Sequence, residues 1–247
     1  VGVAQGYLDR GVEVGGHKKY EGVFPLGVGL KEVDEAIERG AVIGKEKWTK
    51  PDGQAWFLYS GSLSHNYDFL TIIHAARQAK AKFGDRVRFI ITGQGELAEK
   101  GRQLVKRHDL SNVTMTGFLD FDEWAYLLSQ VDAGFNAAFP DALIYFPNKI
   151  FYYLAAGAAV LNTIPGQCAE VVEQGECGLT YNAGDPDGCF QAIERLVENP
   201  HERRAMGAAA RRLAEEKYDR AIVYRDMTRF LESVVEDHAS TSRSLTH

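Results

Sequence analysis

The chain has 247 residues, of which 45% are hydrophobic, and its 28 basic and 34 acidic residues give a net charge of −6. The apolar fraction can supply a buried core and argues against disorder, and the negative charge without a basic block argues against a nucleic-acid partner. The longest apolar run, residues 150–161, is too short to cross a bilayer, and no signal peptide opens the sequence. Three cysteines without zinc spacing fit a reducing compartment. We therefore expect a cytoplasmic α/β protein.

The first 55 residues give few signs of regular structure. Residues 1–28 contain seven glycines and little periodicity, and the sequence at 23–29 predicts a short strand followed by a turn. A small helix is expected at Leu30–Arg39, with Gly40 as its C-terminal stop. Residues 41–55, which contain a Pro-Asp-Gly sequence, are expected to form a loop.

From Trp56 onward, short apolar runs alternate with amphipathic stretches, which indicates strands alternating with helices. This alternation implies a parallel sheet with helices on both faces, a doubly wound, Rossmann-like α/β fold. Residues 237–247 are expected to form a disordered tail. Ligands of such sheets bind beyond the carboxyl ends of the strands. Strands are expected at 56–60, 87–92, 112–117, 133–139, 158–163 and 178–181, and helices at 68–80, 96–108, 122–130, 148–156, 169–174, 186–198, 201–216 and 220–236.

The loop after the first strand begins with Gly61 and Ser62. Glycine lets a backbone approach a ligand closely, and hydroxyl and N–H groups at the start of a helix favour an anion. An ordinary strand–helix turn with a serine cap would have the same sequence. His65 lies in this loop and is the one histidine that we expect near a site.

The loop after the second strand fits the pattern G-x-G-x-x-A at Gly93, Gly95 and Ala98. This pattern is a variant of the dinucleotide-binding fingerprint, and Asp120 follows Gly95 by 25 residues, close to where a ribose-binding acid would lie. The alternative is a tight glycine turn that geometry alone requires.

Lys149 stands in the first turn of an expected helix, next to Asn148. The helix dipole disfavours a cation at that end, so the lysine is better explained if an anion such as a pyrophosphate lies in front of it. The alternative is a solvated lysine in an exposed first turn.

Two other strand-end loops carry candidate residues. The backbone of Phe118 and Leu119 could pair with the edge of a nucleobase, or this segment could simply lead into the next helix. Glu170 opens a later helix, where a carboxylate also stabilises the helix dipole. Cys168 is interpreted as a small apolar filler.

Taken in order, these segments resemble the C-terminal, donor-binding half of GT-B glycosyltransferases of the retaining group 1 (family 4-like) type. The resemblance rests on the ordered set GSL, TGQGE, GFL, PNKIFYYLAAG and PGQCAEVVEQGECGL, followed by paired C-terminal helices. It implies that residues 1–28 are a remnant of an N-terminal domain and linker, and that residues 29–55 are a connecting helix and loop. Residues 56–236 would then be the nucleotide-sugar-binding domain.

The resemblance implies a UDP- or GDP-sugar donor, a glycan or lipid-linked acceptor, no metal and no other cofactor. It implies that the missing N-terminal domain is a partner, and it assigns no catalytic residue. The glycine loops and the Asn148–Lys149 pair would lie at the donor phosphates, Phe118 and Leu119 at the base, and Glu170 near the sugar. The implied donor-site residues are Gly61, Ser62, Gly93, Gly95, Phe118, Leu119, Asn148, Lys149, Tyr152 and Glu170.

Four positions depart from the family pattern. Ser62 and Tyr67 stand where many members carry an arginine and a lysine, and Tyr152 and Ile144 stand where members carry paired glutamates. Three functions therefore remain under consideration. The first is a glycosyltransferase of cell-surface polysaccharide or lipopolysaccharide synthesis, located in the cytoplasm or peripherally at the inner membrane face. The second is an NAD(P)-binding oxidoreductase domain, and the third is a nucleotide-binding module that has lost catalysis.

Overall fold

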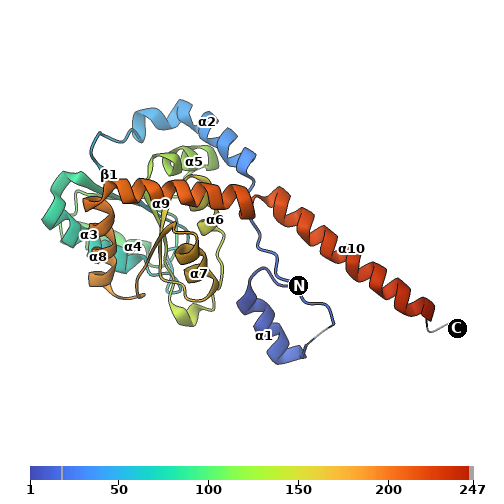
Figure 1. Cartoon of the computed structure of the whole chain (residues 1–247). Coiled ribbons are helices and arrows are strands. Elements are labelled where there is room, and N and C mark those ends of the chain that lie inside the picture. The colour runs from blue at the N-terminus through green and yellow to red at the C-terminus, as the bar shows by residue number, and fades with distance from the viewer. Residues whose placement is uncertain (18, 245–247) are drawn as a thin grey trace.

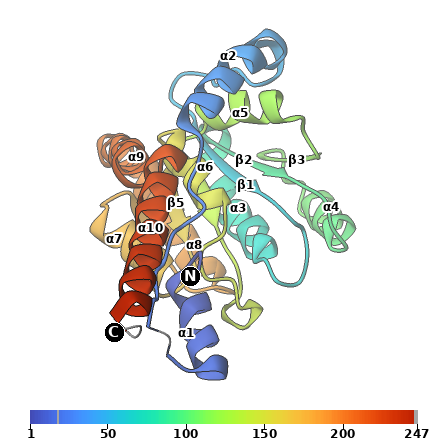
Figure 2. The same cartoon turned by 90° about the vertical axis from the view of Figure 1, so that its right-hand side faces the viewer.

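A computed structural model describes residues 1–17 and 19–244 of the chain. Six parallel strands form one sheet in the order β3-β2-β1-β4-β5-β6, which is the doubly wound arrangement predicted from the sequence (Figure 2). All six expected strands are present, although β4 is shorter than expected. The strands are β1 (Ala55–Ser60), β2 (Val87–Thr92), β3 (Val113–Gly117), β4 (Ala133–Asn136), β5 (Ala159–Asn162) and β6 (Gly178–Thr180).

Helices cover both faces of the sheet, because side chains along each strand alternate between two cores. Trp56 and Leu58 of β1 belong to one core, with residues of α5, α6 and α9, whereas Phe57 and Tyr59 belong to the other, with residues of α3 and α8. Both faces are apolar, as expected for a parallel sheet. The helices are α1 (Gln5–Gly15), α2 (Leu30–Lys47), α3 (Phe69–Phe83), α4 (Ala98–Arg107), α5 (Phe121–Gln130), α6 (Lys149–Ala155), α7 (Gln167–Gln174), α8 (Pro186–Glu198), α9 (Pro200–Leu213) and α10 (Arg220–Ser244).

The two ends of the chain differ most from expectation. The glycine-rich N-terminus forms α1, and residues 23–29 form no strand but make isolated bridges to other segments, at Val23 and Val28. The expectation of a disordered tail from residue 237 onward was wrong as far as Ser244, because α10 extends to that residue. Residues 245–247 of the expected tail lie outside the described residues. None of the helices in the described part of the chain has the length and apolar character needed to span a membrane.

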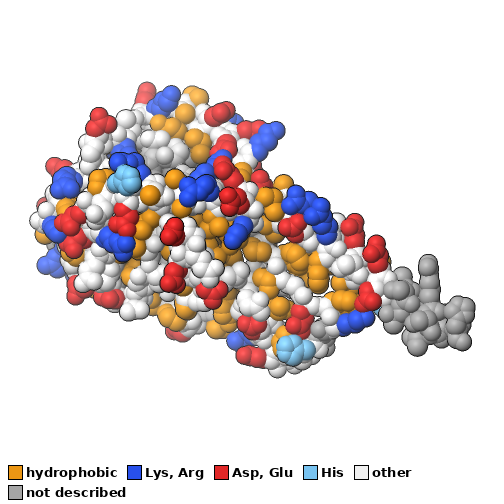
Figure 3. Space-filling view, viewed as in Figure 1, with side chains coloured by type: hydrophobic (Ala, Val, Ile, Leu, Met, Phe, Trp, Pro, Cys, Tyr) orange, Lys and Arg blue, Asp and Glu red, His pale blue; other side chains and the backbone are white. Residues whose placement is uncertain are grey.

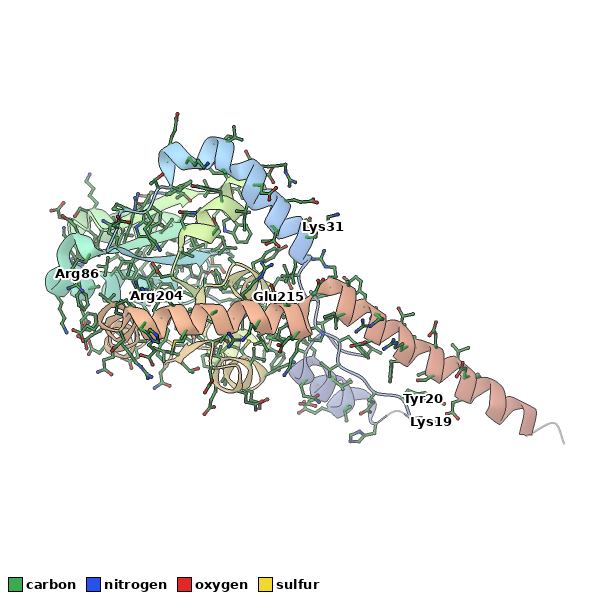
Figure 4. All side chains as sticks on the ribbon, turned by 45° about the horizontal axis from the view of Figure 1, so that its top comes forward. Lys19, Tyr20, Lys31, Arg86, Arg204 and Glu215 are labelled. Carbon is green, nitrogen blue, oxygen red and sulfur yellow. The ribbon has the colours of Figure 1, made fainter. Side chains whose placement is uncertain are left out.

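The N-terminal segment packs along α10, which extends away from the α/β body (Figure 1). The Phe24 ring packs against the Phe230 ring at a tilt, with centroids 5.4 Å apart, and the Lys19 ammonium lies 2.6 Å from an Asp237 carboxylate oxygen. Figure 4 shows Lys19 and Tyr20 beside the distal half of α10, far from the sheet. Apolar side chains continue along this part of the molecule in Figure 3, and Val235 is 68% exposed. The ends of the chain therefore form a unit outside the sheet.

Helix α2 is longer than predicted because Gly40 does not end it. A Cβ on Gly40 would overlap the backbone carbonyl of Asp122 in α5, and one on Gly44 would overlap the Tyr126 ring. Both glycines are buried in the helix interior. Glycine is required at both positions because α2 and α5 pack closely. Gly40 therefore marks a helix–helix contact and not the end of a helix.

We expect Gly40→Ala to lower the free energy of unfolding by about 1–3 kcal/mol, because the added methyl forces α2 away from α5. Urea denaturation followed by far-UV circular dichroism measures this change. The matched control is Gly11→Ala in α1, where the new Cβ meets no atom within 4 Å. An unchanged midpoint for Gly40→Ala would mean that the two helices separate at no cost.

Candidate functional site

A cavity of about 390 Å³ lies where β1 and β2 end, and the loop after β3 and the start of α5 complete it. Its position agrees with the general rule for ligands of doubly wound sheets. None of its lining residues is charged, and most of the lining is apolar. The lining residues are Ser60, Gly61, Ser62, Thr92, Gly93, Gln94, Phe118, Leu119, Phe121 and Trp124.

The floor of the cavity is formed by the loops after β1 and β2, which are joined backbone to backbone. Gly61 N–H donates to the Thr92 carbonyl at 3.1 Å, and Leu63 N–H donates to the Gln94 carbonyl at 2.9 Å. A Cβ on Gly93 would overlap the Gly61 carbonyl, and Gly93 and Gly95 have φ values of +133° and +157°. The fingerprint glycines are therefore required by loop-to-loop packing, which was the alternative interpretation of this motif.

Lys149 approaches the cavity from beneath Gly61. Its Nζ lies 3.0 Å from the position that a Gly61 Cβ would occupy, and 4.3 Å from the ring centroids of both Tyr59 and Tyr67. Nζ is buried and has no hydrogen-bond partner. The alternative interpretation, a solvated lysine in an exposed first turn, was wrong, because the first turn of α6 faces the end of β1 and the lysine side chain places its charge in the interior.

Burial lowers the pKa of the Lys149 ammonium to about 7. The two tyrosine faces favour the charged form and oppose this lowering, although a ring face replaces only part of the lost hydration. The absence of a side chain on Gly61, where φ is +140°, provides the space that the ammonium occupies. Gly61 thus separates a buried cation from the cavity by the thickness of a backbone.

The opposite wall of the cavity is aromatic. Phe121 and Trp124 lie on one face of α5, three residues apart, and Phe118 is 71% exposed at the mouth. Tyr152 of α6 does not line the cavity but supports this wall from behind. Its ring meets Trp124 edge to face at 5.1 Å and Phe121 at 6.2 Å. The residue that the sequence placed at the ribose, Tyr152, therefore packs behind the aromatic wall.

Five of the ten predicted donor-site residues line the cavity, and Gly95 belongs to the interlocked loops that form its floor. Asn148 is exposed beside Lys149 and is not part of the lining. Glu170 lines a separate cavity, which also includes residues of α1 and the Tyr145 loop. The structure therefore does not bring Glu170 into the same pocket as the glycine loops.

Two further expectations concern residues near these loops. The His65 side chain is 76% exposed and lies beside Glu96, outside the cavity lining. Cys168 is fully buried, and its thiol donates to the Tyr145 carbonyl at 3.2 Å. Burial raises the pKa of this thiol to about 12, so the interpretation of Cys168 as a filler is confirmed. Within the described ranges, no group of His, Cys, Asp or Glu side chains is placed to hold a metal ion.

Sequence reasoning missed five lining residues. Ser60 and Thr92 are the last residues of β1 and β2, and their hydroxyls are hydrogen-bonded to each other at 2.9 Å. The rule that ligands bind at strand ends could have identified both. Gln94 lies between the two fingerprint glycines. Phe121 and Trp124 share a helix face, but nothing in their spacing distinguishes a cavity wall from core packing.

Residues 54–199 match the sequence model of the family described as "Glycosyl transferases group 1". This segment is more than half of the chain and contains the whole cavity. The chain belongs to the group 1 glycosyltransferases. The resemblance drawn from the ordered loop motifs is thereby confirmed, whereas the oxidoreductase alternative gains no support.

Two curated relatives are distant in sequence, and their names describe different glycosyltransferase activities. The chain is 26% identical over 207 residues to the O-antigen chain mannosyltransferase C of Escherichia coli, covering 81% of this chain and 52% of that protein. It is 23% identical over 148 residues to the 2-deoxystreptamine N-acetyl-D-glucosaminyltransferase of Niallia circulans, covering 60% of this chain and 37% of that protein. The chain thus spans about half or less of the length of these curated relatives.

Solved structures confirm the GT-B-type fold. The Anabaena protein HepE, crystallised in complex with UDP-glucose, superposes with a TM-score of 0.75 at 18% identity. The match covers 94% of this chain and 63% of HepE. A glycosyltransferase from Rickettsia africae gives a TM-score of 0.78 at 15% identity, covering 94% of this chain and 62% of that one.

The buried ammonium makes folding stability depend on pH. The unfolded chain keeps the Lys149 proton up to the ordinary pKa of 10.5, whereas the folded chain releases it near 7. Relative to Lys149→Met, the free energy of unfolding of the wild type should therefore be constant below about pH 7. It should then rise by up to about 1.4 kcal/mol per pH unit between pH 7 and 10.

Urea denaturation of both proteins at pH 6, 7, 8 and 9 measures this difference. Lys31→Met is the control, because the Lys31 side chain is 91% exposed at the start of α2, as Figure 4 shows. The same pH profile for wild type and Lys149→Met would contradict the lowered pKa.

Proposed function

We propose that this chain binds the nucleoside diphosphate of a UDP- or GDP-sugar in the cavity at the ends of β1 and β2. It would act as the donor-binding half of a glycosyltransferase. The observation that carries the proposal is the difference in chemistry between the two ends of the site. An aromatic wall at one end suits a nucleobase, and a buried cation beneath a glycine loop at the other suits a diphosphate. The crystal structures of HepE in complex with UDP and with UDP-glucose support this assignment.

The individual residues would divide the donor between them. Phe118 and Leu119 would contact the base at the mouth of the cavity, and the Ser62 and Gly93 backbones would lie beside the phosphates. Lys149 would stabilise the diphosphate charge from the far side of the Gly61 backbone. Asn148 and Glu170 would act, if the whole enzyme uses them, from outside this cavity.

The acceptor would be a glycan or a lipid-linked sugar, in the synthesis of a cell-surface polysaccharide or lipopolysaccharide. The name of the Escherichia coli relative supports this class of product. The acceptor would bind between this domain and an N-terminal domain, because transfer requires donor and acceptor in contact. A peripheral location at the inner membrane face would suit a lipid-linked acceptor.

A catalytically inactive nucleotide-binding module is the second candidate, and a specific observation favours it. The two positions that carry paired glutamates in the family hold Tyr152 and Ile144, and both pack against the apolar core. Transfer of glucose or another sugar from a radiolabelled donor by the full-length enzyme separates the two candidates, since both predict donor binding.

We expect UDP or GDP to bind this chain more tightly than NAD, because residues 54–199 match the group 1 glycosyltransferase family and HepE, whose fold the chain shares, was crystallised with UDP. Isothermal titration calorimetry with UDP, GDP, ADP and NAD measures the four affinities. NAD binding without binding of either UDP or GDP would overturn the proposed function.

We expect Lys149→Gln to weaken UDP-glucose binding about tenfold at pH 6, the order of one hydrogen bond or ion contact to a charged group. The loss should shrink at pH 8.5, because the wild-type lysine is then largely neutral. UDP-glucose is suitable because its diphosphate diester does not titrate in this range. Lys31→Gln on the exposed end of α2 should leave binding unchanged, and an equal affinity for Lys149→Gln would remove the lysine from the site.

A further inference from the structure

Trp124 differs from the other tryptophans of the chain in its hydrogen bonding. The chain has three tryptophans. The indole N–H of Trp48 donates to Glu123 at 2.9 Å, and that of Trp56 donates to Gln54 at 2.7 Å. Trp124 Nε1 is buried and has no partner. An unpaired buried donor costs free energy, so a native structure that retains one calls for an explanation.

The position of Trp124 supplies that explanation, because its indole lines the candidate donor cavity. No carboxylate lines the cavity, so the acid that the family resemblance implies for the ribose hydroxyls is absent from its lining. At the position where the family resemblance implies a glutamate, Tyr152 instead holds the indole edge to face at 5.1 Å. The residue at this position therefore supports a hydrogen-bond donor, the Trp124 N–H, where the resemblance implied a carboxylate acceptor.

We infer that Trp124 Nε1–H donates a hydrogen bond to an oxygen of the bound nucleoside, and that Tyr152 positions the indole for this contact. The inference rests on the proposed function, since it requires a nucleotide in the cavity. The accepting oxygen is a ribose hydroxyl or a base carbonyl, both of which have lone pairs for an N–H donor.

Phe121 is the exposed aromatic neighbour of Trp124 in the cavity wall. Its ring lies 5.9 Å from the Trp124 ring, lines the same cavity and is 37% exposed. Because Nε1 itself is covered, the proposed contact requires neighbouring side chains to move when the nucleoside binds. Tyr152 contacts both rings, so it would support the indole in the bound state.

The first measurement follows the indole N–H signals of the wild-type chain by ¹⁵N-edited NMR during titration with UDP or GDP, whichever binds in calorimetry. The chain gives three such signals, and Trp124→Phe identifies the one from Trp124. We expect that signal to move downfield as the nucleotide binds, while the Trp48 and Trp56 signals stay in place.

The second measurement is nucleotide affinity. Trp124→Phe keeps an aromatic ring and removes the N–H, so the dissociation constant should rise roughly two- to tenfold. Trp48→Phe is the matched control, because it removes an indole N–H that is bonded to Glu123 on the far side of α5 from the cavity lining. The control should leave affinity unchanged even if its melting temperature falls.

The accepting atom is identified by repeating the titration with 2′-deoxy and 3′-deoxy nucleotides. If the effect of Trp124→Phe disappears with one analogue, that hydroxyl oxygen is the acceptor; if it persists with both, the acceptor is on the base. Nucleotide binding that shifts backbone amide signals but not the Trp124 indole, with unchanged affinity in Trp124→Phe, would overturn this inference and leave the proposed function intact. Absence of any nucleotide binding would instead overturn the proposed function.

Discussion

The contact between the backbones of Gly61 and Gly93 sets the geometry of the candidate site. The loops after β1 and β2 approach so closely that Gly93 has no room for a side chain, and a Cβ on Gly61 would meet the Lys149 ammonium. Hydrogen bonds between the loops extend the pairing of the two strands beyond the sheet. This close approach creates a smooth backbone floor. It also leaves the space below Gly61 that Lys149 fills. Cavity shape and buried charge therefore depend on the same pair of glycines.

Burying the Lys149 ammonium below Gly61 costs free energy. A lysine ammonium with no hydrogen bond is costly in a protein interior, and burial lowers its pKa to about 7. The faces of Tyr59 and Tyr67 offset part of this cost. A diphosphate on the other side of Gly61 would offset more, because an opposite charge stabilises the ammonium. The fold thus keeps the Lys149 amine buried beside the candidate site, at a cost in folding stability.

The aromatic wall shows how a family site can change its chemistry while keeping its shape. Tyr152 occupies the position of a ribose-binding glutamate in the resemblance, yet its ring packs against Trp124 and Phe121. A carboxylate there would have no partner among these rings and would be costly to bury. The tyrosine at this position is therefore coupled to the aromatic residues of α5, and under the proposed function nucleoside recognition would rest on other polar atoms of the site.

The sequence by itself determined the sheet, its strand-end loops and the family, because apolar runs and ordered glycine motifs are local features that chain order preserves. It could not distinguish a glycine that ends a helix from Gly40, which makes room for α5, since both look identical in one dimension. Tertiary structure alone decided that Lys149 is buried, that Tyr152 supports Trp124, and that Glu170 lies in another pocket. These facts depend on which elements meet across the sheet, and the periodicity of one helix carries no information about the side chains of the next.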